Sequence, residues 1–263
     1  MDKKRDYIVK LSHGWTAAGV EAGDLLLVHS DIRRTLLEAK KLGVYLLPND
    51  ILDSFLFALG PSGTLLVPTF NFDFPKSKSF DIRHTPSQMG ALTEAARNRH
   101  DAVRTGHPIY SFVALGNHRD KFYNVNNESG YGKDSPFGIL HKLGGKIASL
   151  DLEDQVSMTF YHYVEESLKV NYRYFKGFTG EYTDNIGISS ERTYKLFVRN
   201  IEKNVVTDVN PAGELMWCRG IYRGFKPKVE IGLRTVNAAN MFDFVADLIN
   251  RDEAEGFLFR FDN

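Results

Sequence analysis

Only one cysteine, Cys218, occurs among the 263 residues of this chain. A single cysteine excludes an internal disulfide and any zinc or iron–sulfur site that needs several cysteines. A thiol carries an acyl group only when a base or a positive site activates it. Cys218 stands between Trp217 and Arg219, and we expect a buried cysteine without a catalytic role.

The chain also lacks an excess of charge of either sign, because 33 basic residues balance 33 acidic ones. A neutral chain has no overall field that recruits nucleic acid or anionic lipid, so we expect neither as a partner. No apolar run approaches the ~18 residues of a membrane span. The charged segment 1–6 is not followed by the apolar stretch of a signal peptide. These absences predict a cytoplasmic protein.

Glycine-rich nucleotide motifs are missing too. The sequence contains neither a Gly-x-Gly-x-x-Gly segment nor a Walker loop, so it does not indicate nucleotide binding by those routes.

Apolar side chains, at 43% of the residues, are sufficient for a packed core. Predicted strands cover 25–28, 64–69, 110–115, 146–150, 193–198, 205–209 and 221–231, and predicted helices cover 49–59, 86–97, 157–169 and 241–250. Strands alternate with helices early and cluster later, which predicts an α/β fold with a mixed central sheet flanked by helices. We expect a single domain over 1–263, with a smaller C-terminal lobe from about residue 180 as an alternative.

Five segments share their order and spacing with one known family. They are 23–30 (GDLLLVHS), 60–70 (GPSGTLLVPTF), 80–94 (FDIRHTPSQMGALTE), 104–111 (RTGHPIYS), and 134–138 (DSPFG) followed by 159–165 (TFYHYVE). Over roughly residues 20–180 the chain resembles the aminoglycoside 3-N-acetyltransferase, or antibiotic acetyltransferase, family. The resemblance implies that family's fold and an acyl-CoA-dependent N-acyltransferase acting on small molecules. Acyl-CoA would be a co-substrate, with no permanently bound cofactor.

His162 and Glu165 are the candidates for acid–base chemistry. They lie three residues apart on a predicted helix, so they share one face, where a carboxylate orients an imidazole. From the spacing alone a surface His–Glu pair is the commoner outcome. The resemblance favours catalysis, because His162 matches the family's base and Glu165 its acidic residue. A di-iron site needs two such motifs and further carboxylates, so we expect no metal.

Two positions near residue 110 bear on the acceptor pocket. The family usually has His-Pro-x-His-Ser, whereas this chain has Tyr110 in place of the second histidine. His107 is a candidate for lining the pocket or assisting proton movement, and a structural histidine is the alternative. Tyr110 predicts a pocket whose polarity differs from that of typical members.

The stretch 80–94 joins a polar turn to a predicted helix, with Thr85 as N-cap and Pro86 in the first helical position. Asp81 is a candidate for binding the acceptor's ammonium group or serving as a second base, and His84 is a candidate substrate contact. The alternative for Asp81 is an Asx-turn that only shapes the loop.

Coenzyme A would lie near the ends of the first two strands and needs cations for its phosphates. The candidate contacts are Ser30, Arg33, Arg34, Thr69 and Ser135, with Lys76 and Lys78 as weaker ones. Many family members carry a glycine-containing segment before the histidine block, but residues 150–156 contain no glycine.

The segment 169–178 is basic and aromatic, and it suggests the acceptor. A polycationic drug favours an acidic surface, whereas rings and cations such as Arg173 and Lys176 suit a base and a diphosphate. We therefore predict acyl transfer to a nucleotide-linked amino sugar in surface-polysaccharide biosynthesis. The alternatives are an aminoglycoside 3-N-acetyltransferase that confers antibiotic resistance, and a non-catalytic protein that binds coenzyme A or a sugar nucleotide.

Overall fold

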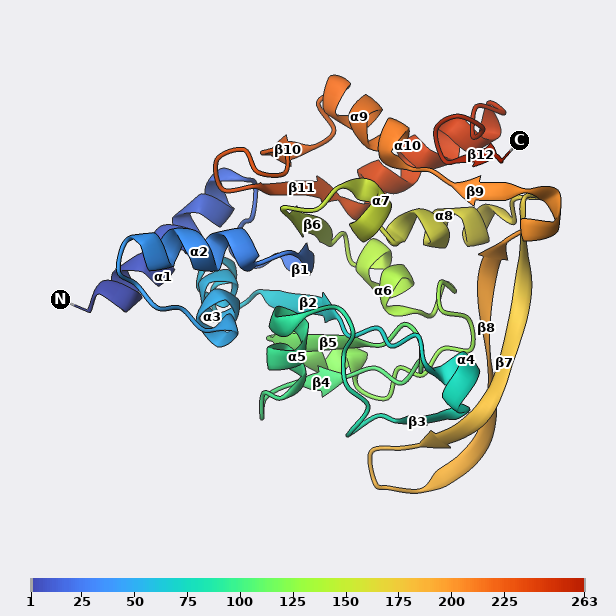
Figure 1. Ribbon diagram of the computed structural model, residues 1–263, viewed down its shortest axis with the longest axis horizontal. Helices are drawn as coiled ribbons and strands as arrows, with labels where there is room; N and C mark the ends of the chain where they lie inside the picture. Colours follow the sequence, from blue (N-terminus) through green and yellow to red (C-terminus); the bar gives the residue numbers. More distant parts are fainter. Residues whose placement is uncertain (1, 263) are drawn as a thin grey trace.

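A seven-stranded mixed sheet forms the centre of the computed structural model, which describes residues 2–262 (Figure 1). Its order is β10-β11-β6-β1-β2-β5-β4. The strands are β1 (Leu25–Ser30), β2 (Thr64–Pro68), β4 (Val103–Arg104), β5 (Phe112–Gly116), β6 (Lys146–Leu150), β10 (Arg223–Gly224) and β11 (Leu233–Asn237). Strands β1, β2 and β6 are mutually parallel, and the outer strands pair antiparallel.

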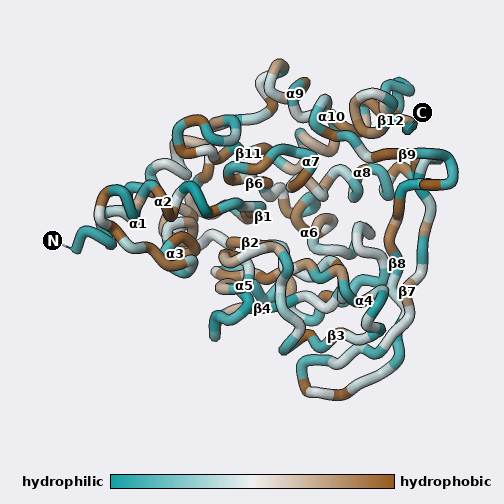
Figure 2. Tube along the Cα trace, in the orientation of Figure 1, coloured by the Kyte–Doolittle hydropathy of each residue, from teal (hydrophilic) through white to brown (hydrophobic). Residues whose placement is uncertain are grey.

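Helices cover both faces of this sheet, which explains the uninterrupted apolar run in β1. Leu26 and Val28 belong to one buried cluster and Leu25 and Leu27 to the other, as the alternation of a strand requires. The first cluster packs under α1 (Lys3–Ala17), α3 (Pro48–Leu59) and α5 (Ala91–Arg97). The second packs under α6 (Pro136–Lys142), α8 (Phe160–Leu168) and α10 (Ala238–Asn250). Brown, apolar segments recur along β2 and β5 in Figure 2.

A long hairpin projects beside the sheet and is the second main feature of the molecule (Figure 1). It consists of β7 (Arg173–Thr183) and β8 (Ser189–Arg199), and the short β3 (Ser79–Asp81) pairs parallel with β7. After the hairpin, β9 (Val205–Thr207) pairs with β12 (Phe259–Phe261), and β11 returns to the main sheet beside β6. The single domain over 1–263 and the alternative of a smaller C-terminal lobe from about residue 180 both stay predictions.

The predicted helix 86–97 ends correctly at Arg97, but its predicted start at Pro86 is wrong, because residues 85–90 form a loop and α5 begins at Ala91. Gly90, immediately before α5, has φ 106°, a conformation that glycine adopts readily and that no α-helix contains. The hydroxyl of Thr85 accepts a hydrogen bond from the Asp81 amide at 2.9 Å and does not cap a helix.

Several other boundaries differ from the sequence-based prediction. The strand predicted at 221–231 is wrong, since only Arg223–Gly224 is extended there and the longer strand is β11. The predicted helix 157–169 divides at Met158 into α7 (Asp154–Ser157) and α8. Several helices were not predicted, among them α1, α2 (Arg33–Lys41), α6 and α9 (Asn210–Cys218).

The remaining short elements are α4 (Phe74–Ser77), η1 (Arg119–Phe122) and η2 (Ile201–Lys203). Within residues 2–262 no helix is long and apolar enough to span a bilayer.

Candidate active site

His162 and Glu165 form a direct pair on α8, as their spacing predicts. His162 Nδ1 lies 2.7 Å from Glu165 Oε2. The Glu165 side chain is fully buried, and that of His162 is 20% exposed. A second partner reaches the same carboxylate oxygen, because Arg173 Nε at the start of β7 lies 2.8 Å from Oε2. If Nδ1 donates to the carboxylate, the lone pair of His162 is on Nε2 and is available for a proton.

Electrostatics keeps this pair in the state that a general base needs. Burial lowers the pKa of His162, the positive Arg173 lowers it further, and Glu165 opposes both. Burial alone would raise the pKa of Glu165, but Arg173 and His162 outweigh it, so the pKa of Glu165 is lowered. At neutral pH the histidine is therefore neutral and the glutamate ionised.

A cavity of about 360 Å³ opens beside His162. Aromatic and apolar residues of the hairpin and its surroundings form most of its wall, together with three cations. The lining residues are Tyr110, Tyr131, His162, Arg173, Tyr174, Lys176, Phe178, Leu196, Phe197, Val198, Arg199, Ile201 and Thr207. No Asp or Glu is among them, and Lys176 and Arg199 form no ion pair within residues 2–262. We call this space the His162 cavity.

This cavity brings together four of the predicted site residues, which are Tyr110, His162, Arg173 and Lys176. Tyr131, which sequence reasoning missed, packs between two of them. Its ring centroid lies 5.2 Å from that of His162 and 4.8 Å from that of Tyr110. The signal for Tyr131 was weak, a lone tyrosine three residues ahead of the Asp134 block.

Arg173 also lines the cavity, but its guanidinium is occupied by the protein. The side chain is 4% exposed and bonds Glu165, the Phe197 carbonyl at 3.1 Å and the Thr207 hydroxyl at 3.0 Å. The structure therefore gives Arg173 internal partners where the sequence suggested a substrate contact.

His107 is fully buried, and its Nδ1 accepts the amides of Ile109 at 3.2 Å and Tyr110 at 3.0 Å. Burial lowers the pKa of His107 to about 3, so it is neutral at physiological pH. This geometry favours the structural alternative, in which His107 holds the turn that presents Tyr110.

The polar turn at Asp81 is folded onto itself. Asp81 accepts the Arg83 amide at 2.9 Å, which is an Asx-turn, and pairs with the Arg83 side chain at 2.8 Å. Asp81 and His84 are not among the lining residues of the His162 cavity. The structural alternative for Asp81 is the one that the geometry supports.

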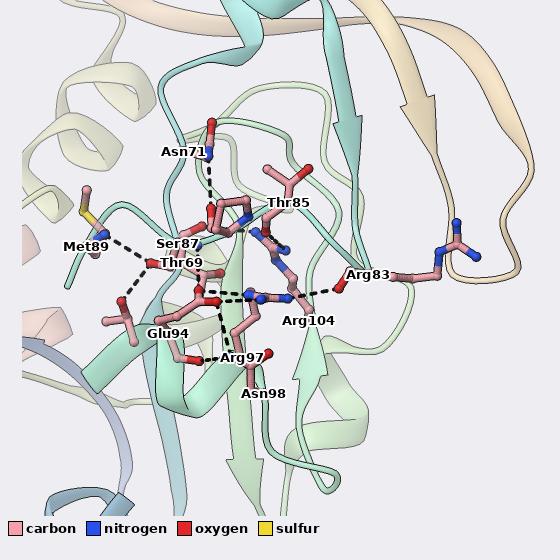
Figure 3. A network of polar contacts seen from close by, with 12 residues as sticks. Thr69, Asn71, Arg83, Thr85, Ser87, Met89, Glu94, Arg97, Asn98 and Arg104 are labelled. Carbon is pink, nitrogen blue, oxygen red and sulfur yellow. Dashed lines mark hydrogen bonds and ion pairs between the residues drawn. The ribbon is translucent and has the colours of Figure 1, made fainter. Parts of the chain in front are cut away.

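Two arginines hold the loop between Asp81 and α5, as Figure 3 shows. Arg104 donates to the carbonyls of Ile82 at 3.0 Å and Thr85 at 2.6 Å. Arg97 pairs with Glu94 at 2.6 Å and donates to the Arg83 carbonyl at 3.0 Å.

Glu94 completes this assembly, because it also accepts the Ser87 amide at 2.8 Å. Arg97 lowers the pKa of Glu94 to about 2. We call this assembly the loop clamp. The block with the clearest sequence signal is thus a scaffold, and it presents residues 88–93 as the wall of a second space.

That second space lies at the carboxyl ends of β1, β2 and β6. Two adjoining cavities of about 500 and 660 Å³ share Asp31, Arg33, Leu152 and Val156 as lining residues. Ligands in α/β sheets bind outside the carboxyl ends of parallel strands. We call this space the strand-end groove.

Of the predicted coenzyme A contacts, Ser30 and Arg33 line the groove. Arg34 does not line it, because its guanidinium binds the buried Asp151 at 2.8 Å and Glu38 at 2.7 Å. Lys228, which sequence reasoning missed, does line it and has no ion pair within the described residues. No local pattern marks Lys228, which comes from a distant loop.

Thr69 and Ser135 are unavailable to a ligand, since both are fully buried. The Thr69 hydroxyl lies 3.0 Å from that of Ser111, and Ser135 caps α6 by accepting the Gly138 amide. Lys76 and Lys78 are not among the groove residues. Cys218 is exposed, so the expectation of burial is wrong.

Within residues 2–262 no group of three or more His, Cys, Asp or Glu side chains could hold a metal ion.

Comparison with known proteins points to one family. A family model described as aminoglycoside 3-N-acetyltransferase matches residues 27–250. The chain is 25% identical over 208 residues to aminoglycoside N(3)-acetyltransferase VII of Streptomyces paromomycinus, covering 72% of this chain and 68% of that protein. It is 34% identical over 90 residues to the SPbeta prophage-derived aminoglycoside N(3')-acetyltransferase-like protein YokD of Bacillus subtilis (strain 168). That match spans only 33% of either chain.

Solved structures share the whole fold. The crystal structure of aminoglycoside acetyltransferase AAC(3)-Xa superposes with a TM-score of 0.75 at 24% identity, covering 94% of this chain and 92% of that one. The structure of AAC-IIIb binary with CoASH gives a TM-score of 0.75 at 21% identity, covering 93% and 96%. The predicted α/β fold with a mixed, helix-flanked sheet is confirmed.

The predicted acceptor, a nucleotide-linked amino sugar, is wrong. The family model is described as aminoglycoside 3-N-acetyltransferase, and the Streptomyces relative is an aminoglycoside N(3)-acetyltransferase. Both descriptions name an aminoglycoside acceptor, which was the stated alternative. The charge argument misled because the two cations at this cavity that form no ion pair within the described residues, Lys176 and Arg199, are exposed, and solvent screens exposed charges.

Proposed function

Because the chain belongs to the aminoglycoside 3-N-acetyltransferase family, we propose that it transfers an acetyl group from acetyl-CoA to an amine of an aminoglycoside. Acyl-CoA-dependent N-acyl transfer is the chemistry of the family. The observation that carries the proposal is the His162–Glu165 pair, held at 2.7 Å beside a cavity within the matched residues.

The base has a definite task in this reaction. Only a neutral amine attacks a thioester, and an alkylamine with a pKa near ~10 is mostly protonated at pH 7. Nε2 of His162 takes the proton as the nitrogen attacks the thioester carbon. The tetrahedral intermediate then collapses, the C–S bond breaks, and coenzyme A leaves as a thiolate that recovers a proton. Glu165 holds Nδ1–H throughout and stabilises the imidazolium.

The strand-end groove supports the placement of acetyl-CoA. Its two adjoining cavities have room for an extended ligand, and Leu36, Leu152 and Val156 offer apolar contact for a pantetheine arm. Lys228, which has no ion pair within the described residues, and Arg33, which is paired with Asp31, bring positive charge to the same groove, which suits phosphates. A relative in fold, AAC-IIIb, was solved with CoASH.

The His162 cavity supports the placement of the acceptor. With no carboxylate in its wall, the cavity would contact an aminoglycoside ring through aromatic faces and hydroxyl groups, such as those of Tyr110 and Tyr131. The acceptor's remaining ammonium groups would then point away from Lys176 and Arg199, toward solvent.

A thiol-release assay with acetyl-CoA and a panel of aminoglycosides tests the proposal. We expect release that depends on the aminoglycoside, a product heavier by one acetyl group, and modification of the 3-amine by NMR. Arms without acceptor and with a simple alkylamine measure thioester hydrolysis and unselective transfer. Acetyl-CoA binding without transfer to any aminoglycoside would contradict the proposal and favour a non-catalytic binding protein.

A further inference from the structure

His162, Glu165 and Arg173 form one connected group, in which both other side chains contact Oε2 of Glu165, and we call it the base assembly. We propose that Arg173 is a positioning residue that orients Glu165 on His162 and supplies the positive charge that keeps the pair free of an extra proton at neutral pH. The inference rests on the proposed role of His162 as general base.

The geometry of the guanidinium supports an orienting role. Glu165 Oε2 lies 2.7 Å from His162 Nδ1 and 2.8 Å from Arg173 Nε, so one oxygen joins the two side chains. The other two guanidinium nitrogens bind the Phe197 carbonyl on β8 and the Thr207 hydroxyl on β9. Hydrogen bonds to two separate strands thus fix two of the three nitrogens, and Nε lies against Glu165 as an ion pair. The guanidinium cannot turn without breaking these contacts.

The charge balance of the assembly supports the second role. With Arg173, an ionised Glu165 and a neutral His162 sum to zero charge. Without Arg173 the buried pair carries one negative charge and binds a proton more readily, whichever residue receives it. A proton on His162 removes the base, and a proton on Glu165 removes the group that orients it. Either outcome stops turnover.

The other groups around the pair cannot replace this charge. Tyr110, Tyr131 and Tyr172 face it, and burial raises the pKa of each, so all are neutral. Glu166, the next residue on α8, bonds the Ser129 hydroxyl at 2.7 Å.

Lys176 and Arg199 lie in the same cavity but are exposed. Solvent screens exposed charges far more than buried ones. Arg173 is therefore the cation that sets the charge at Glu165.

The test compares pH profiles of kcat/KM for one aminoglycoside in the wild type, Arg173→Met and Arg173→Lys. We expect Arg173→Met to move the acidic limb upward by about one pH unit or more, since a neighbouring opposite charge shifts a pKa by that order. Arg173→Lys keeps the charge but loses the fork, so it should show a smaller shift. Arg192→Met is the matched control, because Arg192 lies on the same hairpin outside the cavity, and its limb should not move.

A merely structural Arg173 gives a different result. Arg173→Met would then lose the same fraction of activity at every pH, with the limb unmoved, and this would overturn the proposal. If Arg173→Met fails to fold by circular dichroism, Arg173→Gln, which is uncharged but polar, takes its place with the same expected shift.

Failure of the proposed function is distinguishable from failure of this inference. Titration of His162 by NMR with ¹⁵N-labelled histidine needs no substrate. It should show a higher titration midpoint for the pair in the Arg173 variants than in the wild type, even if no aminoglycoside is acetylated. Equal midpoints would contradict the inference.

Discussion

The loop clamp and the base assembly each contain a Glu–Arg ion pair, but the first holds a loop and the second lies at the candidate base. In the clamp, Glu94 pairs with Arg97 at 2.6 Å and accepts a backbone amide. In the base assembly, Glu165 pairs with Arg173 at 2.8 Å and accepts from His162. Each arginine also donates to a backbone carbonyl of another segment.

Two differences separate the assemblies. The Glu94 side chain is 33% exposed, whereas that of Glu165 is fully buried. The third partner is an amide in the clamp and an imidazole in the base assembly, and only an imidazole exchanges protons near neutral pH. An Arg–Glu pair by itself therefore holds a segment in place, whereas catalysis requires in addition a titratable partner that faces a cavity.

His162→Ala should produce the largest effect. It removes the proton acceptor, so turnover should fall by about 10²- to 10⁴-fold, the usual contribution of a general base. Thiol release measures the loss, and the thermal midpoint should change little because His162 lies at a cavity wall. A folded His162→Ala protein with full turnover would exclude His162 as the base.

Glu165→Gln should produce the largest loss of stability. It leaves Arg173 buried without a counter-charge, and breaking such a pair costs about 3–5 kcal/mol. Urea unfolding at pH 7 measures the free energy. A loss below that of Glu94→Gln would reverse the proposed ranking of the two assemblies.

Glu94→Gln, the matched change in the clamp, should cost about 1.5 kcal/mol at pH 7, as for a hydrogen-bonded charge near the surface. The folded pKa of about 2 lies below the ordinary 4.5, so this stabilisation is present above pH 4.5 and is lost as the pH falls toward 2. Wild type and variant should therefore converge in acid. The acidic limb of kcat/KM should not move, in contrast to Arg173→Met.

Lys176→Glu should produce the smallest effect. It replaces a repulsive charge with an attractive one in the His162 cavity, so the KM for an aminoglycoside should fall by about 3- to 10-fold at low salt and less at high salt. The KM for acetyl-CoA should not change. Lys142→Glu, at the exposed end of α6 and outside that cavity, is the control. An unchanged aminoglycoside KM would show that the acceptor binds elsewhere.

The sequence predicted correctly those helices and strands whose positions depend on interactions between neighbouring residues. The strand at 146–150 is correct to the residue, and the helix at 49–59 is correct within one residue, because apolar runs and helix ends are short-range signals. The helix start at Pro86 is wrong for an equally physical reason. Side chains from Glu94 and Arg104 satisfy the loop's backbone groups, so a polar, proline-containing stretch needs no helix there.

The residues of the candidate site also differ in whether local sequence predicts them. The spacing of His162 and Glu165 requires only one helical turn, and the sequence alone determined that these side chains share a face. Tyr131, Lys228 and the internal partners of Arg173 come from segments far apart in the chain, which no local pattern connects.

The family, the alternating α/β pattern and the closeness of His162 to Glu165 could thus be predicted from the sequence. Packing between distant segments determines which polar residues face a ligand and which are occupied by the protein. Thr69, Ser135 and Arg34 have the right chemistry for coenzyme A, but each already has protein partners. The physical reason is that a polar group binds a ligand only where the fold leaves it both accessible and without a partner, and packing determines both.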